Sequence, residues 1–237
     1  MDIVVQIIRF SFWSGITVLF GGLLAYFFNK KINNLTIKNF IITILMSFGG
    51  GVILSAVCFV LIPEGLEKTN LLRGLILFFS GSIAFLLIDR AIANKGGSYA
   101  QLMAMLLDFV PEALSLGAIF ALDPSLGMIL AIFIGIQNLP ESFNAYFELK
   151  KGKFTDKSIF ILFFCLSFVG IISALVGHFI LSSHEELTGS VMLLASGGII
   201  YIIFQDIAPK IKIENSWIPA LGFNLGIGLG IIGTAIG

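Results

Sequence analysis

Eight long apolar runs limit what this chain can fold into. A helix needs about 20 predominantly apolar residues to cross the hydrocarbon core of a bilayer. The runs are continuous and do not alternate between apolar and polar residues, which favours helices over the strands of a barrel. The sequence therefore predicts an all-α integral membrane protein with one transmembrane domain, 1–237, and eight transmembrane helices at about 4–28, 40–62, 71–89, 100–122, 125–147, 159–181, 187–208 and 216–236.

Composition also indicates a membrane protein. Hydrophobic residues make up 57% of the chain and charged residues 12%, about half of the charged fraction of a soluble domain. The net charge is zero, so no nucleic-acid partner is indicated. Cys58 and Cys165 lie in apolar runs without a CxxC pair, which argues against a disulfide framework. The N-terminal stretch MDIVVQIIRF has no early lysine, so we interpret it as part of the first span and not as a secretion signal.

The lysines and arginines predict the orientation of the spans. Positively charged residues gather in the cytoplasmic connections of membrane proteins. The connections after the first, third, fifth and seventh runs are therefore expected to be cytoplasmic, since they hold Lys30, Lys31, Lys38, Arg90, Lys95, Lys150, Lys151, Lys153, Lys157, Lys210 and Lys212. We expect a multi-pass protein of the cell (inner) membrane, with the N- and C-termini outside.

Two spans resemble one another. GGGVILSAVCFVLIPE at 49–64 and SGGIIYIIFQDIAPK at 196–210 both place glycines about three helical turns before a proline. Under the expected topology these spans cross the membrane in opposite directions, which is typical of carriers built from inverted repeats. We therefore expect a 3+2+3 arrangement with inverted repeats. The alternative is that two glycine-rich helices resemble one another by chance.

Four carboxylates fall inside the apolar runs: Asp108, Glu112, Glu141 and Asp206. Burying a charge in the bilayer costs about 2.5–3.5 kcal/mol even on the insertion scale that gives the lower values. No basic residue is expected at the same depth, so these acids must be protonated, hydrated or neutralised by a bound cation. Several acids together favour cation handling. The alternative is that single protonated acids form hydrogen bonds with neighbouring helices.

Spacing predicts that the acids of two runs meet at one point. Residues four apart lie on one face of a helix, as Asp108 and Glu112 do in the fourth run. Gln137 and Glu141 repeat this spacing in the fifth run, with Asn138 on the same side. A very short turn joins the two runs, so they should form an antiparallel hairpin in which the polar groups lie at matching depths.

A proline precedes each of the two glutamates. Pro111 and Pro140 have no amide hydrogen, so the carbonyl groups of Leu107 and Ile136 lose their helical partners. Kinks at these positions would let both helices bend around the site. The freed carbonyl groups could add oxygen ligands.

The stretches DFVPEA at 108–113 and QNLPES at 137–142 resemble the paired motifs of the ZIP (Zrt/Irt-like) divalent metal transporters. The eight spans, the outward termini and the sequence of the second span are also similar to that family. The resemblance implies a metal site, often binuclear, whose exposure alternates through an elevator-like or rocking motion. It implies ligands at Asp108, Glu112, Gln137, Asn138 and Glu141, with Asp206 near a position that contacts a second metal.

The chain departs from the family pattern at three positions of the first motif. Asp108 replaces a histidine, Phe109 an asparagine and Ala113 a glycine. Losing the asparagine weakens the argument for a second metal. Losing the histidine leaves carboxylate and amide oxygens, which suit manganese, ferrous iron, magnesium or calcium better than zinc.

The expected function is therefore divalent metal transport by alternating access, with the metal ion as substrate and no prosthetic cofactor. Two alternatives stay open: a cation-selective channel and a proton-coupled carrier of another cation. An intramembrane enzyme is not expected, because the sequence contains neither an HExxH motif nor an arginine cluster. The expected partners are the divalent metal ion and the lipid bilayer. The oligomeric state stays open, with a homodimer among the alternatives.

Overall fold

The computed structural model contains the eight predicted spans. It describes residues 2–32, 34–95, 100–213 and 216–236, and within these it describes only the backbone of 35, 93–95, 100–104, 108 and 236. Helices that are long and apolar enough to cross a membrane cover Ile3–Lys31, Thr36–Glu67, Leu71–Ile92, Met105–Leu122, Pro124–Lys151, Asp156–Leu181, Glu185–Lys210 and Ile218–Ala235. The described part of the chain contains no strand. The all-α prediction is confirmed.

Each span is one helix or a short series of helices. The α-helices are α1 (Ile3–Lys31), α2 (Leu35–Ala56), α3 (Ile62–Glu67), α4 (Leu71–Lys95), α5 (Ala100–Leu122), α6 (Pro124–Lys151), α7 (Asp156–Val176), α8 (Glu185–Ile202), α9 (Ala208–Lys210) and α10 (Ile218–Ile236). Several helices continue past their apolar runs, since α1 and α6 include the lysine pairs at their ends. A helix satisfies its own backbone in water as well as in lipid, so hydropathy marks only the part within the hydrocarbon.

Side-chain caps define where several helices begin. The Asn34 carboxamide oxygen accepts from the backbone N–H groups of Thr36 and Ile37 at the start of α2. Thr155 caps α7 through the N–H of Ser158. Such caps satisfy the first N–H groups of a helix, which have no partner within the helix.

Three spans contain a π-helical turn, which the sequence did not predict. The turns are η1 (Val57–Leu61), η2 (Gly177–Leu181) and η3 (Ile203–Ile207). Both η1 and η3 end two residues before a proline, Pro63 and Pro209. A proline cannot donate to the preceding helical turn, and π turns often mark functional positions in helices.

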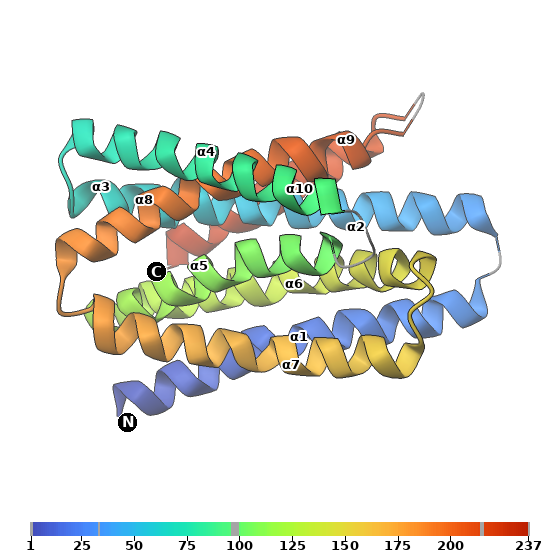
Figure 1. The fold of residues 1–237 in the computed structure, drawn as a ribbon, viewed down its shortest axis with the longest axis horizontal. Coiled ribbons are helices and arrows are strands. Elements are labelled where there is room, and N and C mark those ends of the chain that lie inside the picture. The colour runs from blue at the N-terminus through green and yellow to red at the C-terminus, as the bar shows by residue number, and fades with distance from the viewer. Residues whose placement is uncertain (1, 33, 96–99, 214–215, 237) are drawn as a thin grey trace.

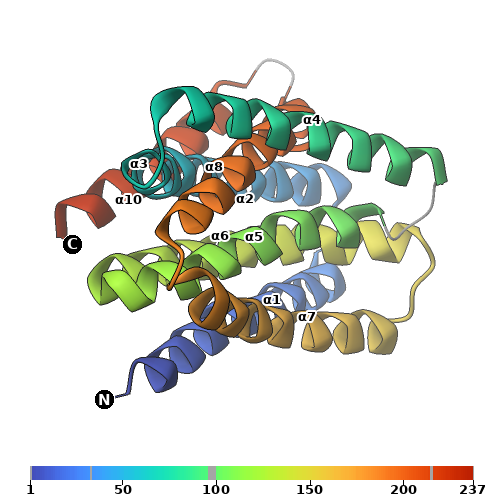
Figure 2. The same cartoon turned by 60° about the vertical axis from the view of Figure 1, so that its left-hand side comes forward.

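The helices form two groups that lie side by side along the long axis of the bundle (Figure 1). The α2 group consists of α2 packed on α10 and α4 packed on α8, together with the short α3 and α9. The α6 group consists of α1, α5, α6 and α7, in which α1 packs on both α6 and α7. The two groups meet mainly where α2 contacts α6 and α8 contacts α5. Figure 2 shows the same division from another side.

Apolar side chains cover both the inside and the outside of the bundle. Ile7, Val57, Leu116 and Ile134 are among the completely buried residues between helices. Large apolar side chains also point outward, and Leu72, for example, is 71% exposed. A soluble protein rarely exposes so large an apolar surface, so this surface agrees with a lipid environment.

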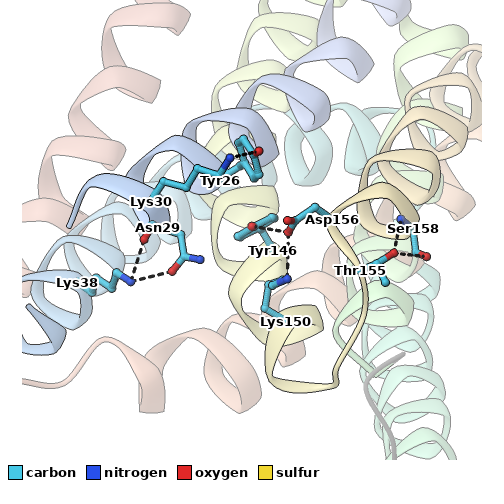
Figure 3. A network of polar contacts seen from close by, with 9 residues as sticks. All are labelled: Tyr26, Asn29, Lys30, Lys38, Tyr146, Lys150, Thr155, Asp156 and Ser158. Carbon is cyan, nitrogen blue, oxygen red and sulfur yellow. Dashed lines mark hydrogen bonds and ion pairs between the residues drawn. The ribbon is translucent and has the colours of Figure 1, made fainter. Parts of the chain in front are cut away.

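Both termini lie at one end of the bundle, and the connections α1–α2 and α6–α7 lie at the other (Figure 1). We call the latter the lysine-rich end, because it holds Lys30, Lys38, Lys150, Lys151 and Lys210. There the Tyr146 hydroxyl donates to Asp156 at 2.8 Å, and Lys150 pairs with the same carboxylate at 3.1 Å. These contacts, shown in Figure 3, tie the end of α6 to the start of α7.

Candidate metal site

The hairpin of α5 and α6 brings the two proline-containing motifs together. Asp123 forms the turn between the helices and caps α6, since its carboxylate accepts from the N–H groups of Ser125 at 2.9 Å and Leu126 at 3.1 Å. Pro124 occupies the first turn of α6, where its missing N–H costs no helical hydrogen bond. The short turn leaves α5 and α6 antiparallel and in contact.

Glu112 of α5 and Gln137 of α6 meet inside the bundle. The Gln137 side-chain nitrogen donates a hydrogen bond to Oε2 of Glu112. Glu112 is 0% exposed and Gln137 is 1% exposed. The remaining oxygens of both side chains, Glu112 Oε1 and Gln137 Oε1, have no hydrogen-bond partner among the described residues. Buried polar atoms without a partner are rare, so these two oxygens are available to a ligand.

Glu141 extends this site toward a cavity. It lies one helical turn after Gln137, on the same face of α6. The cavity is small, with a volume of about 40 Å³. We call it the acid cavity, and its walls include Gly49 and Gly50 of α2, Glu141 and Asn144 of α6, Asp206 of η3 and Lys210 of α9.

The structure therefore places Asp206 across the same cavity from Glu141. Asp206 is held on the π turn η3, in the α2 group, whereas Glu141 belongs to the α6 group. The acid cavity is thus a boundary between the two groups of helices. Neither carboxylate forms an ion pair with any residue whose side chain the structure describes.

The Asn138 side chain contacts a different helix. Its nitrogen donates to the backbone carbonyl of Ser14 on α1 at 2.9 Å, and Asn138 is 1% exposed. Its spacing from Glu141 predicts a shared face, yet this hydrogen bond joins α6 to α1. The same helix therefore carries Asn138, which donates to α1, Gln137, which donates to Glu112, and Glu141 and Asn144, which line the acid cavity.

The Asp108 side chain lies outside the described residues, so its contacts with the site are not part of the structure. Its backbone belongs to α5, one helical turn before Glu112. Among the residues that the structure does describe, no group of three or more His, Cys, Asp or Glu side chains is close enough to hold a metal. The described oxygen donors are therefore those of Glu112, Gln137 and Glu141, with Asp206 across the cavity.

Two residues of the acid cavity were missed by the sequence analysis. Lys210 lines the same cavity as Asp206 and attracts its carboxylate, although a lysine was not expected at the depth of the acids. The spacing of four residues between them is the signal that predicts this proximity on a helix. Asn144 follows Glu141 by three residues, which predicts a position on the same face.

The donors at this site are carboxylate and amide oxygens, the kind of ligand that magnesium, calcium and manganese take in proteins. Buried carboxylates are costly unless they are protonated or lie beside an opposite charge. Eight apolar helices are typical of a membrane transporter or channel. No protein-family model matches the chain, and no curated protein matches it.

Proposed function

We propose that the protein transports a divalent metal cation across the membrane by alternating access, and that it is not an enzyme. The observation that carries the proposal is the pair of buried oxygens on Glu112 and Gln137 that have no partner among the described residues, with a second carboxylate, Glu141, one helical turn after Gln137. A bound cation would neutralise both acids and give these oxygens a partner. The resemblance of DFVPEA and QNLPES to the ZIP motifs supports the same conclusion.

The proposal includes a 3+2+3 arrangement with inverted repeats. The same number of residues separates the members of three matching pairs: Gly51 and Gly197, η1 and η3, and Pro63 and Pro209. In the structure α2 packs on α10 and α8 packs on α4. If the first three spans are superimposed on the last three, α2 corresponds to α8 and α4 corresponds to α10. The α2–α10 pair then becomes the α8–α4 pair, as a repeat requires.

Uptake by purified protein in liposomes tests the proposal. Manganese, ferrous iron, zinc, magnesium and calcium would be offered separately, and entry followed with a reporter inside the vesicles. A carrier gives a rate that saturates with metal concentration, whereas a channel gives a flux that follows the gradient without saturating. Empty liposomes are the control. No uptake of any divalent metal above that control would contradict the proposal.

Metal preference gives a further prediction at Asp108. We expect Asp108→His to shift preference toward zinc relative to manganese, because an imidazole nitrogen suits zinc better than a carboxylate does. Zinc uptake by the variant should also fall below about pH 6.5, where an imidazole with an unperturbed pKa becomes protonated. Competition between the two metals in liposomes measures the shift. An unchanged ranking would mean that Asp108 does not bind the metal.

Orientation is a proposal with its own test. The lysine-rich end should face the cytoplasm and both termini the outside. Lys151→Cys, with Cys58 and Cys165 replaced by alanine, should react with a membrane-impermeant thiol reagent only in inverted vesicles. A cysteine at Glu185, at the opposite end, should react only in right-side-out cells. Labelling in the reverse pattern would overturn the orientation.

A further inference from the structure

A second cavity adjoins the acid cavity at the lysine-rich end. It has a volume of about 230 Å³ and shares Met46, Asn144 and Lys210 with the acid cavity. We call it the lysine cavity. Its polar lining includes Lys38 and Thr43 of α2, Asn144, Glu148 and Lys151 of α6, and Lys210 of α9. Three lysines thus surround one opening beside a site built for cations.

Two buried side chains on the wall of the lysine cavity have no partner. Asn144 is 6% exposed and Thr43 is 9% exposed. Both line the lysine cavity, and neither side chain donates or accepts a hydrogen bond within the part of the chain that the structure describes. The Asn144 amide and the Thr43 hydroxyl therefore keep their hydrogen-bonding capacity for a polar ligand in the cavity.

The charged groups around the cavity favour a negative ligand. Lys210 forms no ion pair with any residue whose side chain is described, although Asp206 attracts it. Lys38 donates to the Asn29 carboxamide oxygen at 2.7 Å, which fixes its position, as Figure 3 shows, and does not neutralise it. An ammonium group has three donors, so Lys38 keeps capacity for a ligand.

Among the described residues that line this cavity, Glu148 is the one acid. It pairs with Lys151 at 2.9 Å, and the two side chains are 37% and 73% exposed. An exposed ion pair of this kind contributes little to stability, and the single Glu148 charge neutralises at most one of the lysines. Two ammonium groups, Lys38 and Lys210, then line the cavity, and neither forms an ion pair with a carboxylate whose side chain the structure describes. A divalent cation would be repelled here, whereas an anion would be held.

We propose that the lysine cavity binds a phosphate-class anion, either free in solution or as the headgroup of an anionic lipid. Lysines bind phosphate as point charges, and the Asn144 amide and the Thr43 hydroxyl can donate to its oxygens. A cavity of about 230 Å³ is large enough for a phosphate group. The bound anion offsets the lysine charge at the mouth of the acid cavity. This site goes beyond metal transport and does not depend on it.

Binding to the purified full-length protein in a neutral detergent, without divalent metal, tests the proposal. Isothermal calorimetry would be run with inorganic phosphate and separately with short-chain phosphatidylglycerol. We expect Lys210→Met to raise the dissociation constant about tenfold or more, as expected for losing a charged hydrogen bond. Lys157→Met is the matched control, because Lys157 is exposed at the same end and does not line the cavity. It should leave binding unchanged.

Asn144→Leu gives a second variant that keeps every charge. It should also weaken binding, because a leucine of similar size cannot donate to the anion. Binding of inorganic phosphate supports a soluble anion, and binding of phosphatidylglycerol alone supports a lipid headgroup. Binding of neither probe overturns the proposal. So does equal weakening by Lys157→Met, which would indicate general positive charge and no site. Loss of metal transport would not affect this result.

Discussion

Glu112→Gln and Glu141→Gln should each reduce divalent metal uptake by at least about 100-fold. Changing a group that only orients a metal ligand typically costs 10–100-fold, so removing a ligand carboxylate should cost no less than the upper value. Each change removes one negative charge while keeping the shape of the side chain and its capacity for hydrogen bonds. The initial rate of uptake into liposomes is the measurement.

The matched control is Glu185→Gln, because Glu185 is an exposed acid at the opposite end of the bundle. It should transport like the unchanged protein. Every variant must elute as a single species after purification, so that loss of transport is not loss of folding. Saturable uptake at the normal rate by either Glu112→Gln or Glu141→Gln would remove the central claim.

Gly51→Leu and Gly197→Leu should each prevent the bundle from assembling normally. A Cβ atom at Gly51 would overlap the backbone carbonyl of Phe223 on α10, and one at Gly197 would overlap the backbone carbonyl of Phe78 on α4. A backbone cannot move aside as a side chain can, so we expect a cost of about 3 kcal/mol or more, the upper part of the range for overpacking. The thermal midpoint of the purified protein measures it.

Gly228→Leu provides the comparison for this prediction. Nothing lies within 4 Å of a Cβ atom at Gly228, which is on α10. The variant adds the same side chain to a membrane helix and should keep the thermal midpoint of the unchanged protein. If Gly197→Leu were as stable as Gly228→Leu, α4 and α8 would not pack as closely as the structure has them.

The spans could be predicted because the bilayer acts on length and hydropathy alone. Eight runs of sufficient length gave eight helices, and the turn at Asp123 was short enough to require that α5 and α6 be neighbours. The contact between Glu112 and Gln137 followed from counting helical turns on either side of that turn. Each of these inferences needs only local sequence and the geometry of one hairpin.

Other parts of the site depend on contacts between distant segments. Asn138 has the spacing of a ligand, and in the structure its side-chain nitrogen also donates to the Ser14 carbonyl on α1, a proximity that the sequence does not contain. Lys210 was assigned to a connection, whereas the helical span continues to include it. The π turns were not predicted, because a single extra residue in a helical turn leaves the apolar pattern nearly unchanged.

The boundary between the α2 group and the α6 group has a consequence for the rate of transport. Glu141 belongs to the α6 group and Asp206 to the α2 group, so an ion held by both carboxylates would cross-link them. Under alternating access such an ion must release one group before the groups can slide. Each tenfold gain in affinity that depends on both carboxylates adds about 1.4 kcal/mol to the free-energy cost of that release. The tightest-binding metal would then be an inhibitor, and the best substrate would be one of intermediate affinity.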